Sequence, residues 1–303
     1  MRTVFLGTSG FAATVLRRLA ESEHRPRLVL TPPDRPRGRG RRLASPPAAE
    51  AARDLGLDLL QTESVNAPDA VERVRATDPE VGAVCAFGQL IKEPLLCSLE
   101  LLNVHPSLLP RWRGAAPIER ALMAGDAETG VSVMRLTAGL DSGPVALEER
   151  VEIDPDEDFG ALEPRLATLG GELLVRALDL RAEDRLEFTE QDDSLATYAE
   201  KIDAADRRLD PSRPAAELAA TVRGLTPHIG AFLELEGGAR LGVCRAEAVP
   251  GQLRPGVLRA GAEELMLGTA DGFLRLLVVQ PAGKRPMPVD AYLRGHPAPA
   301  LQR

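Results

Sequence analysis

The sequence predicts an α/β protein, with a Rossmann-like, mostly parallel sheet domain followed by a small OB-like (oligonucleotide-binding type) β-barrel domain. Strand, turn and helix patterns alternate over the first 180 residues, which is typical of a parallel sheet with helices between its strands. After residue 206, short strand patterns recur at close intervals beside one helix, as in a partly open barrel. We therefore expect a first domain at 1–185, a linker at 186–206 and a second domain at 207–303.

The first domain is expected to begin with a strand, a tight turn and a helix. Residues 2–7 form an apolar run, the segment 7–10 supplies the turn, and a helical pattern begins near Phe11. Further apolar runs predict buried strands, and apolar residues at helical spacing predict helices. The strands are expected at 28–30, 59–60, 81–86, 101–102, 130–136 and 145–153, and the helices at 48–55, 70–76, 117–124 and 162–178.

The second domain is expected to contain one helix and five short strands. Turn residues separate the strand patterns at short intervals, and several short strands with one helix fit a small closed or partly open barrel. The helix is expected at 214–222 and the strands at 231–235, 240–246, 256–258, 264–267 and 273–280.

An arginine cluster lies between the second strand and the second helix of the first domain. The segment 31–42 is so rich in proline and glycine that we expect no regular structure in it. It carries five arginines against one aspartate, although the formal net charge of the chain is −8. Such a cluster predicts phosphate contacts, and the candidates are Arg37, Arg39, Arg41 and Arg42.

Composition excludes several other classes of protein. No apolar run approaches the roughly 18 residues of a membrane helix, and the N-terminal residues read as a strand with no signal peptide. The three cysteines are widely scattered and match neither a disulfide framework nor a metal site. We expect a cytoplasmic protein that binds no metal and no membrane.

The segment Asn103–Gly114 is the candidate active site. Asn103 and His105 follow a short apolar strand at alternate positions, so both side chains should project from one face. Pro106, Pro110 and the glycine at the end of the segment then stop the strand and prevent a helix. Polar residues at the carboxyl end of such a strand lie where open α/β sheets bind ligands.

The residue types in this segment indicate acyl transfer. An amide that donates a hydrogen bond and an imidazole can together stabilise the oxyanion that forms when a nucleophile adds to a carbonyl. Ser107 lacks the G-x-S-x-G context and no cysteine is near, so we expect direct transfer without a covalent intermediate. Asp141, in the turn 139–143, is the best candidate to orient His105, although an aspartate there could equally cap the turn.

The other histidines and the glycines suggest no competing site. His24 lies among charged neighbours and is expected at the surface, while His228 and His296 are expected in structural or solvated roles. A dinucleotide site is disfavoured, because Gly7-x-x-Gly10 departs from the G-x-G-x-x-G pattern that such sites use.

The motifs N-x-H-x-S-L-L-P at 103–110 and L-D-S-G at 140–143 resemble those of the formyltransferases that use 10-formyltetrahydrofolate. The resemblance covers nearly the whole chain and is strongest to the branch that acts on methionyl initiator tRNA. It implies that Asn103, His105 and Asp141 are catalytic. It also implies a folate site, with residues from two segments: Ser107, Leu108, Leu109, Pro110, Phe87, Gly88, Gln89, Leu90 and Ile91.

Two further segments resemble the parts of this branch that contact tRNA. The segment 33–40 is similar to its P-D-R-P-x-G-R-G loop, in which Arg39 is the matched arginine, and 283–287 matches a signature that makes Lys284 and Arg285 tRNA contacts. The implied function is formyl transfer to the α-amino group of methionyl initiator tRNA, in translation initiation. We expect the chain to act as a monomer. The second domain has few aromatic residues, so phosphate contacts are its expected mode of binding.

Two alternatives share the same motifs. A formyltransferase acting on a nucleotide-linked amino sugar would use the same three catalytic residues, but would have no clear use for the arginine cluster. A catalytically silent RNA-binding relative would retain the fold, but the presence of Asn103, His105 and Asp141 together would then have no explanation.

Overall fold

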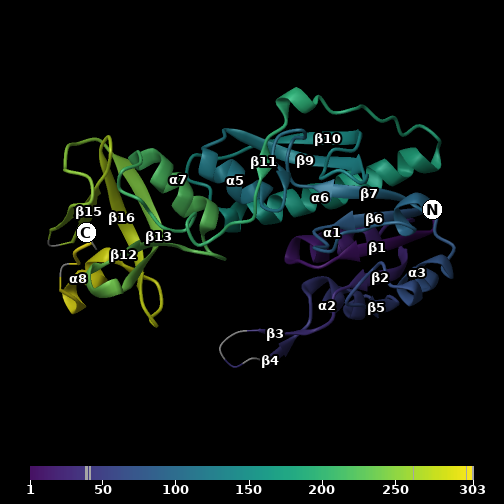
Figure 1. The fold of residues 1–303 in the computed structure, drawn as a ribbon, viewed down its shortest axis with the longest axis horizontal. Coiled ribbons are helices and arrows are strands. Elements are labelled where there is room, and N and C mark those ends of the chain that lie inside the picture. The colour runs from purple at the N-terminus through teal and green to yellow at the C-terminus, as the bar shows by residue number, and fades with distance from the viewer. Residues whose placement is uncertain (38–39, 41, 262, 298, 302–303) are drawn as a thin grey trace. The chain divides into compact units, whose positions relative to one another are not determined.

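The computed structural model describes residues 1–37, 40, 42–261, 263–297 and 299–301 (Figure 1). The chain forms two compact units. The first contains Met1–Gly114, Thr129–Glu152 and Glu163–Tyr198, and the second contains Ala115–Glu128, Ile153–Leu162 and Ala199–Arg303. Each unit is therefore built from segments that lie far apart in the sequence.

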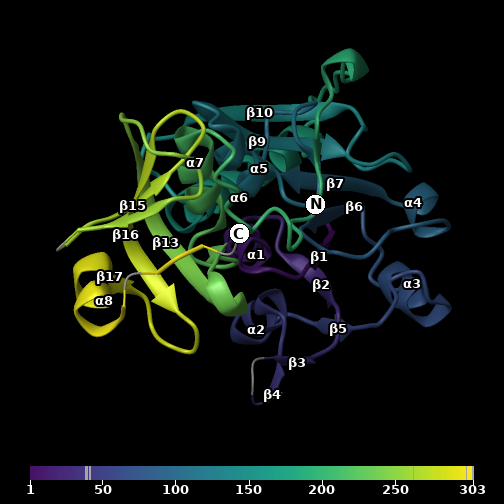
Figure 2. The same ribbon diagram turned by 60° about the vertical axis from the view of Figure 1, so that its left-hand side comes forward.

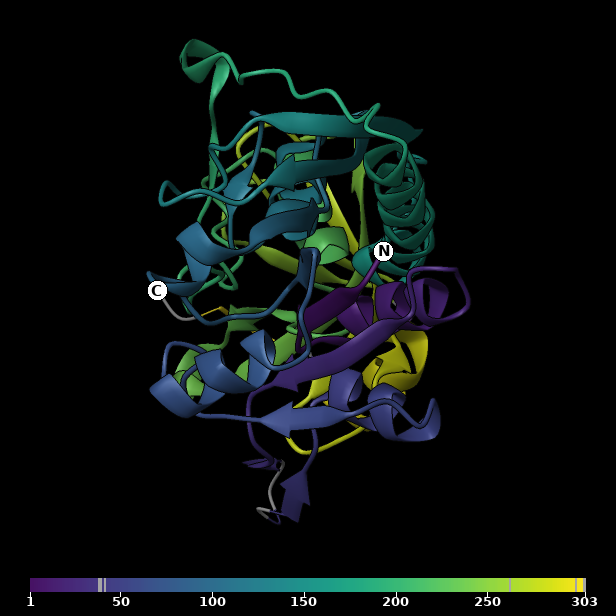
Figure 3. The same ribbon diagram turned by 90° about the vertical axis from the view of Figure 1, so that its right-hand side faces the viewer.

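The first unit contains a seven-stranded sheet with the order β10-β9-β7-β6-β1-β2-β5. Four neighbouring pairs, from β5 through β2, β1 and β6 to β7, are parallel, and β9 pairs with β7 antiparallel. Figure 3 shows these strands side by side in one twisted sheet. The strands are β1 Thr3–Gly7, β2 Pro26–Thr31, β5 Leu59–Gln61, β6 Val81–Cys85, β7 Glu100–His105, β9 Glu128–Arg135 and β10 Val145–Glu152. The predicted Rossmann-like, mostly parallel sheet is confirmed.

The helices of the first unit lie between these strands in the sequence, except α6, which follows β10. Ser9 caps the first of them, with its side chain accepting a hydrogen bond from Ala12 N. The four-residue helix α4 was not predicted. The helices are α1 Gly10–Ala20, α2 Pro47–Asp54, α3 Pro68–Arg75, α4 Leu95–Ser98 and α6 Phe159–Ala182, of which Glu163–Ala182 belongs to this unit.

Two consecutive glycines let α6 approach the sheet and its neighbouring helix closely. A Cβ on Gly170 would lie 2.9 Å from Val104 Cγ1, and a Cβ on Gly171 would lie 2.8 Å from Arg18 Cβ. Real side chains do not pack this tightly, so glycine is required at both positions for the observed spacing. Helix α6 consequently covers the face of β7 to which Val104 points.

The arginine cluster is more regular than predicted. Residues Arg35–Arg37 form strand β3, which pairs antiparallel with β4, Arg42–Ala44. The expectation of no regular structure over 31–42 is therefore wrong for Arg35–Arg37 and for Arg42. A two-stranded ladder has only edge strands, in which a proline such as Pro36 can be accommodated, because one side of each strand forms no ladder hydrogen bonds.

His24 is buried, and the prediction that it lies at the surface is wrong. Its Nδ1 is 2.8 Å from the N-terminal amine of Met1, and its Nε2 is 2.8 Å from Asp179 Oδ1. The hydroxyl of Thr3 also donates to the His24 carbonyl oxygen, at 2.8 Å. These partners come from distant parts of the sequence, so the charged neighbours of His24 gave no indication of them.

Among its described residues, the second unit contains a six-stranded antiparallel sheet, three complete α-helices and the first turn of α6. The strand order is β12-β13-β16-β15-β14, with β17 paired to β16. The predicted second domain of short strands is confirmed and its sheet is antiparallel, while closure into a barrel stays a prediction. Helix α8, which was not predicted, packs near β16 and β17 (Figure 2). The elements are α5 Pro117–Ala124, α7 Ala215–Leu225, β12 Ala231–Glu234, β13 Arg240–Val249, β14 Leu258–Ala260, β15 Leu265–Gly268, β16 Phe273–Pro281, β17 Met287–Pro288 and α8 Val289–Gly295.

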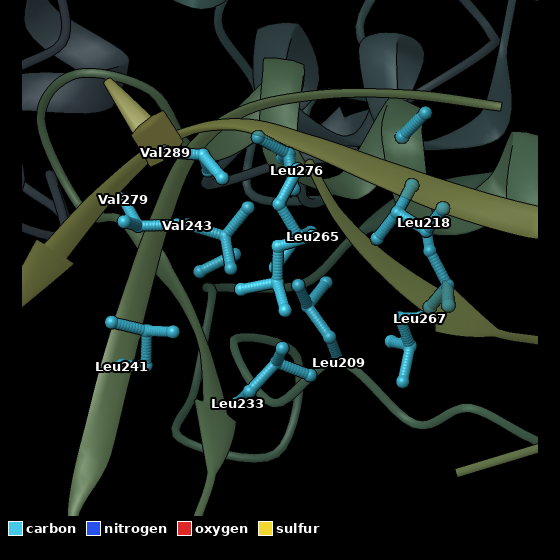
Figure 4. Close-up of a cluster of buried hydrophobic side chains, with 14 of the residues drawn as sticks. Leu209, Leu218, Leu233, Leu241, Val243, Leu265, Leu267, Leu276, Val279 and Val289 are labelled. Carbon is cyan, nitrogen blue, oxygen red and sulfur yellow. The ribbon is translucent and has the colours of Figure 1, made fainter. Parts of the chain in front are cut away.

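One hydrophobic cluster forms the core of this second unit. Figure 4 shows its leucine and valine side chains pointing toward one another from the sheet and from α7. Leu218 of α7 and Leu233, Leu265 and Leu267 of the sheet are fully buried. Helix α7 also packs closely on α5, since a Cβ on Gly224 would lie 2.9 Å from the Glu119 carbonyl oxygen.

Residues 186–198, expected to belong to a linker, lie within the first unit and form hydrogen bonds with other parts of it. Thr189 exchanges backbone hydrogen bonds with Val145, and Thr197 O accepts one from Arg113 N in the short strand β8, Arg113–Gly114. The segment includes a 3-10 turn at Asp193–Leu195 and leads into β11, Tyr198–Ala199. The functional domain limits 1–185 and 207–303 stay predictions.

Candidate active site

Strand β7 presents Asn103 and His105 on one face of the sheet. Val104, between them, points toward α6 and packs against Gly170. Alternate residues of a strand point to opposite faces, so Asn103 and His105 both face away from α6, at the carboxyl end of the strand. Both residues are nearly covered, with 8% of Asn103 and 4% of His105 exposed.

The amide of Asn103 is available to a ligand. No hydrogen bond joins its side chain to another described residue, and neither of its polar atoms is fully buried. An amide nitrogen donates two hydrogen bonds. Asn103 can therefore donate to an oxygen atom of a molecule bound at the end of β7.

The ring of His105 is held between a backbone carbonyl and a carboxylate. Its Nε2 lies 2.9 Å from the Trp112 carbonyl oxygen, and its Nδ1 lies 3.7 Å from Asp141 Oδ2. A carbonyl oxygen only accepts, so its position assigns a proton to Nε2. The nitrogen that can gain or lose a proton is therefore Nδ1, on the side of Asp141.

Asp141 is brought to His105 by a tight turn. Its Oδ2 accepts a hydrogen bond of 2.9 Å from Gly114 N, and 15% of its side chain is exposed. Its backbone has φ of 46°, in the left-handed region, which aspartate tolerates better than most residues. Any side chain at Gly143 would collide with the Arg135 carbonyl oxygen, which explains the glycine there.

The segment after β7 is braced by its own hydrogen bonds. The Ser107 hydroxyl donates to Arg111 O at 2.6 Å, and the Ser132 hydroxyl donates to Ser107 O at 2.8 Å. Trp112, with φ of 62°, donates its backbone N–H to Thr197 Oγ1 at 2.9 Å. Non-glycine residues in this conformation cost free energy and are concentrated at functional sites. The brace keeps the Trp112 carbonyl in place as the acceptor for the imidazole.

The residues expected at the folate site lie in the same unit, in differing environments. The side chains of Phe87 and Ile91 belong to a hydrophobic core cluster of the first unit, and Leu90 is 68% exposed. Gln89 accepts from Val65 N at 2.8 Å. Gly88 has φ of 76°, Ser107 and Leu109 are buried, and Leu108 and Pro110 are half-buried. Contact of these residues with folate stays a prediction.

The residues expected to contact tRNA lie in both units. Arg37 and Arg42 are opposite each other in the β3/β4 pair, and the Arg42 side chain is exposed. Arg39 and Arg41 lie outside the described residues. Lys284 and Arg285 are exposed in the turn between β16 and β17 of the second unit, and no ion pair joins either of them to another described residue. Their role in tRNA binding stays a prediction.

The site offers proton transfer and oxyanion stabilisation, and its hydroxyl and thiol groups are poor nucleophiles. The hydroxyl of Ser107 is buried and bonded to a backbone carbonyl. Burial raises the pKa of the Cys85 thiol, at the end of β6, so it remains protonated near neutral pH. Within the described part of the chain, no group of three His, Cys, Asp or Glu residues could hold a metal, and no helix is long and apolar enough to cross a membrane.

The sequence did not predict four residues that support the site. Trp112 and Thr197 hold His105, and Arg113 and Gln191 lie behind the Asp141 turn, where Gln191 Nε2 donates to Asp141 O at 2.9 Å. The signal that could have found Trp112 and Arg113 is their place within the 103–114 segment. Gln191 and Thr197 had no local signal, because their partners lie 50 and 85 residues away.

Comparison with known proteins gives one family for both units. Residues 1–178 match the formyl transferase family and residues 201–297 match the formyl transferase C-terminal domain. The chain is 43% identical over 300 residues to a methionyl-tRNA formyltransferase of Methylobacterium sp. (strain 4-46), covering 97% of this chain and 96% of that one. It is 42% identical over 299 residues to a protein of the same name from Methylococcus capsulatus, covering 98% and 97%.

A solved structure supports the fold. The chain is similar to WlaRD, a sugar 3N-formyl transferase crystallised in the presence of dTDP and 5-N-formyl-THF, with a TM-score of 0.69 and 14% identity over 94% of this chain and 99% of that chain. At that identity the likeness concerns the fold alone. The family matches and the identity over nearly the full length show that the chain belongs to the formyltransferase family.

Proposed function

We propose that the chain transfers the formyl group of 10-formyltetrahydrofolate to the α-amino group of methionyl initiator tRNA. The observation that carries this proposal is the meeting of Asn103, His105 and Asp141 at the carboxyl end of β7, in a chain so similar to proteins named methionyl-tRNA formyltransferase. The co-substrate is 10-formyltetrahydrofolate, and no metal takes part.

The reaction is a direct transfer. The free amine attacks the formyl carbon, and the carbonyl oxygen gains the negative charge of a tetrahedral intermediate. The Asn103 amide and a protonated His105 Nδ1 donate hydrogen bonds to this oxygen. The carboxylate of Asp141, 3.7 Å from Nδ1, stabilises positive charge on the ring and assists removal of the amine proton. The bond from the formyl carbon to N10 then breaks, N10 takes a proton, and tetrahydrofolate leaves.

The other predicted residues supply substrate binding. We assign the folate to Ser107–Pro110, which follows β7 directly, and to Phe87–Ile91, which comes shortly after β6, the parallel neighbour of β7 in the same unit. We assign tRNA phosphates to Arg37, Arg39, Arg41 and Arg42 in the first domain, at 1–185. Lys284 and Arg285 would contact tRNA from the second domain, at 207–303. Action as a monomer and a cytoplasmic location stay predictions.

The test is a comparison of two acceptors. The purified chain receives 10-formyltetrahydrofolate with either methionyl initiator tRNA or a nucleotide-linked amino sugar, and formyl incorporation is followed. We expect formylation of the tRNA alone. Formylation of the sugar but not of the tRNA would overturn the proposal, and incorporation into neither would favour a silent RNA-binding protein.

A further inference from the structure

We propose that Gln191 is a positioning residue for the reaction: it holds the Asp141 turn in place, and the buried Arg113 sets the orientation of its amide. The inference rests on the proposed function, because Asp141 is the group being positioned. It also gives a role to the segment 186–198, which the sequence predicted to be only part of a linker.

The first half of the network is a buried guanidinium that binds an amide oxygen. Only 3% of Arg113 is exposed, and its Nε and Nη2 donate to Gln191 Oε1 at 3.0 and 2.8 Å. Nη2 also donates to Asp193 Oδ1 at 2.7 Å. The Asp193 side chain is largely exposed. A guanidinium has only donors, so it must face the amide oxygen of Gln191. The amide NH2 group is thereby turned to the opposite side.

The second half of the network is the contact between that NH2 group and the turn. Gln191 Nε2 donates to Asp141 O at 2.9 Å and to Gly143 O at 2.6 Å, so both of its hydrogens are used. These carbonyls flank Ser142 and fix the turn in which Asp141 has its left-handed backbone. The neighbour of Arg113 in β8, Gly114, donates to the Asp141 carboxylate itself. Strand β8 therefore restrains Asp141 in two ways. Gly114 binds the Asp141 carboxylate directly, and Arg113 acts on the Asp141 backbone carbonyl through Gln191.

The variant Gln191→Glu keeps the contact with Arg113 but removes the hydrogen bonds that hold the Asp141 turn. The glutamate has the same size and pairs with Arg113 as an ion pair, but its second oxygen meets two carbonyl oxygens and cannot donate to them. We expect kcat to fall roughly 10- to 100-fold, since a small misplacement of a catalytic group has an effect of this size. The KM values for both substrates should stay within about threefold of wild type, because Gln191 is not assigned to substrate binding.

A matched control removes the other partner of Arg113. Asp193→Asn weakens the ion pair with the same guanidinium and leaves the amide of Gln191 and the turn untouched. We expect its kcat to equal that of wild type. Gln191→Met is the second test variant, because it lacks both the oxygen and the NH2 group and introduces no repulsion. Its kcat should also fall, by a smaller factor than that of Gln191→Glu.

The outcomes distinguish the two proposals. If the wild-type chain does not formylate methionyl initiator tRNA, the proposed function fails. If wild type is active and Gln191→Glu, or Gln191→Met where the first variant does not fold, retains wild-type kcat, the positioning role is wrong. Equal losses of kcat in Asp193→Asn and the Gln191 variants would also overturn it, since the effect would then come from Arg113 alone.

Discussion

Asp141→Asn is expected to slow formyl transfer strongly while leaving substrate binding and folding intact. The substitution removes one negative charge and keeps the size of the side chain. An asparagine Oδ1 can still accept the hydrogen bond from Gly114 N, so the turn retains its restraint. What is lost is the attraction between the carboxylate and positive charge on His105 Nδ1, across 3.7 Å.

The size of this loss follows from the geometry. Two opposite charges about 4 Å apart attract by about 4 kcal/mol at an effective dielectric constant of about 20, which sets an upper value. The Asp141 side chain is 15% exposed, and water there weakens the attraction. A loss of about 2–4 kcal/mol in the transition state corresponds to a fall in kcat of roughly 30- to 1,000-fold.

The assay is single-turnover transfer of a labelled formyl group to methionyl initiator tRNA, with thermal unfolding measured in parallel. Asp184→Asn is the matched control, because Asp184 also has a left-handed backbone, with φ of 54°, but is exposed and pairs with Arg181. It should behave as wild type. An Asp141→Asn variant whose kcat stays within about threefold of wild type would refute the electrostatic role of this carboxylate.

Four further variants test other parts of the structure. Asn103→Ala should lower kcat by about 10²–10³, because one oxyanion donor is lost, and single-turnover kinetics would show it. Arg42→Ala should raise the KM for tRNA, and reduce the slope of log binding constant against log salt by about 1, without changing the KM for folate. Thr197→Val should lower kcat more than Thr197→Ser, which keeps the acceptor oxygen for the backbone N–H beside His105. Gly130→Ala should destabilise the chain by about 1–3 kcal/mol in thermal unfolding, since its Cβ would collide with a neighbouring carbonyl, whereas Gly10→Ala meets no atom within 4 Å and should not.

The features predicted correctly from the sequence depend on short-range patterns. Helix α5 has the predicted bounds, Pro117–Ala124, because proline begins it and Gly125, with φ of 72°, ends it. Asn103 and His105 share a face, as alternate positions of a strand require. The continuous apolar runs of β1 and β6 are buried along their whole length. In each case the signal and the structure lie within a few residues of each other.

The features that were missed depend on contacts between distant segments. His24 is buried because its ring nitrogens meet Met1 and Asp179, the second of which is 155 residues away. The amide of Gln191 meets Arg113 across 78 residues. Neither contact leaves a periodic pattern or a characteristic residue spacing in the sequence from which it could be predicted. The pairing of β3 with β4 was missed for a different reason, since the proline and glycine content of the segment argued against any strand there.

The hydrogen bond from His105 Nε2 to the Trp112 carbonyl restricts what the imidazole can do during a reaction. A histidine with both nitrogens accessible can take up a proton on one side of the ring and release it from the other. Here one nitrogen keeps its proton, so any proton that His105 receives must leave again through Nδ1. The ring therefore cannot pass a proton from one of its nitrogens to a group beyond the other. The Asp141 carboxylate lies 3.7 Å from Nδ1, so a negative charge sits beside the one ring nitrogen through which His105 exchanges protons.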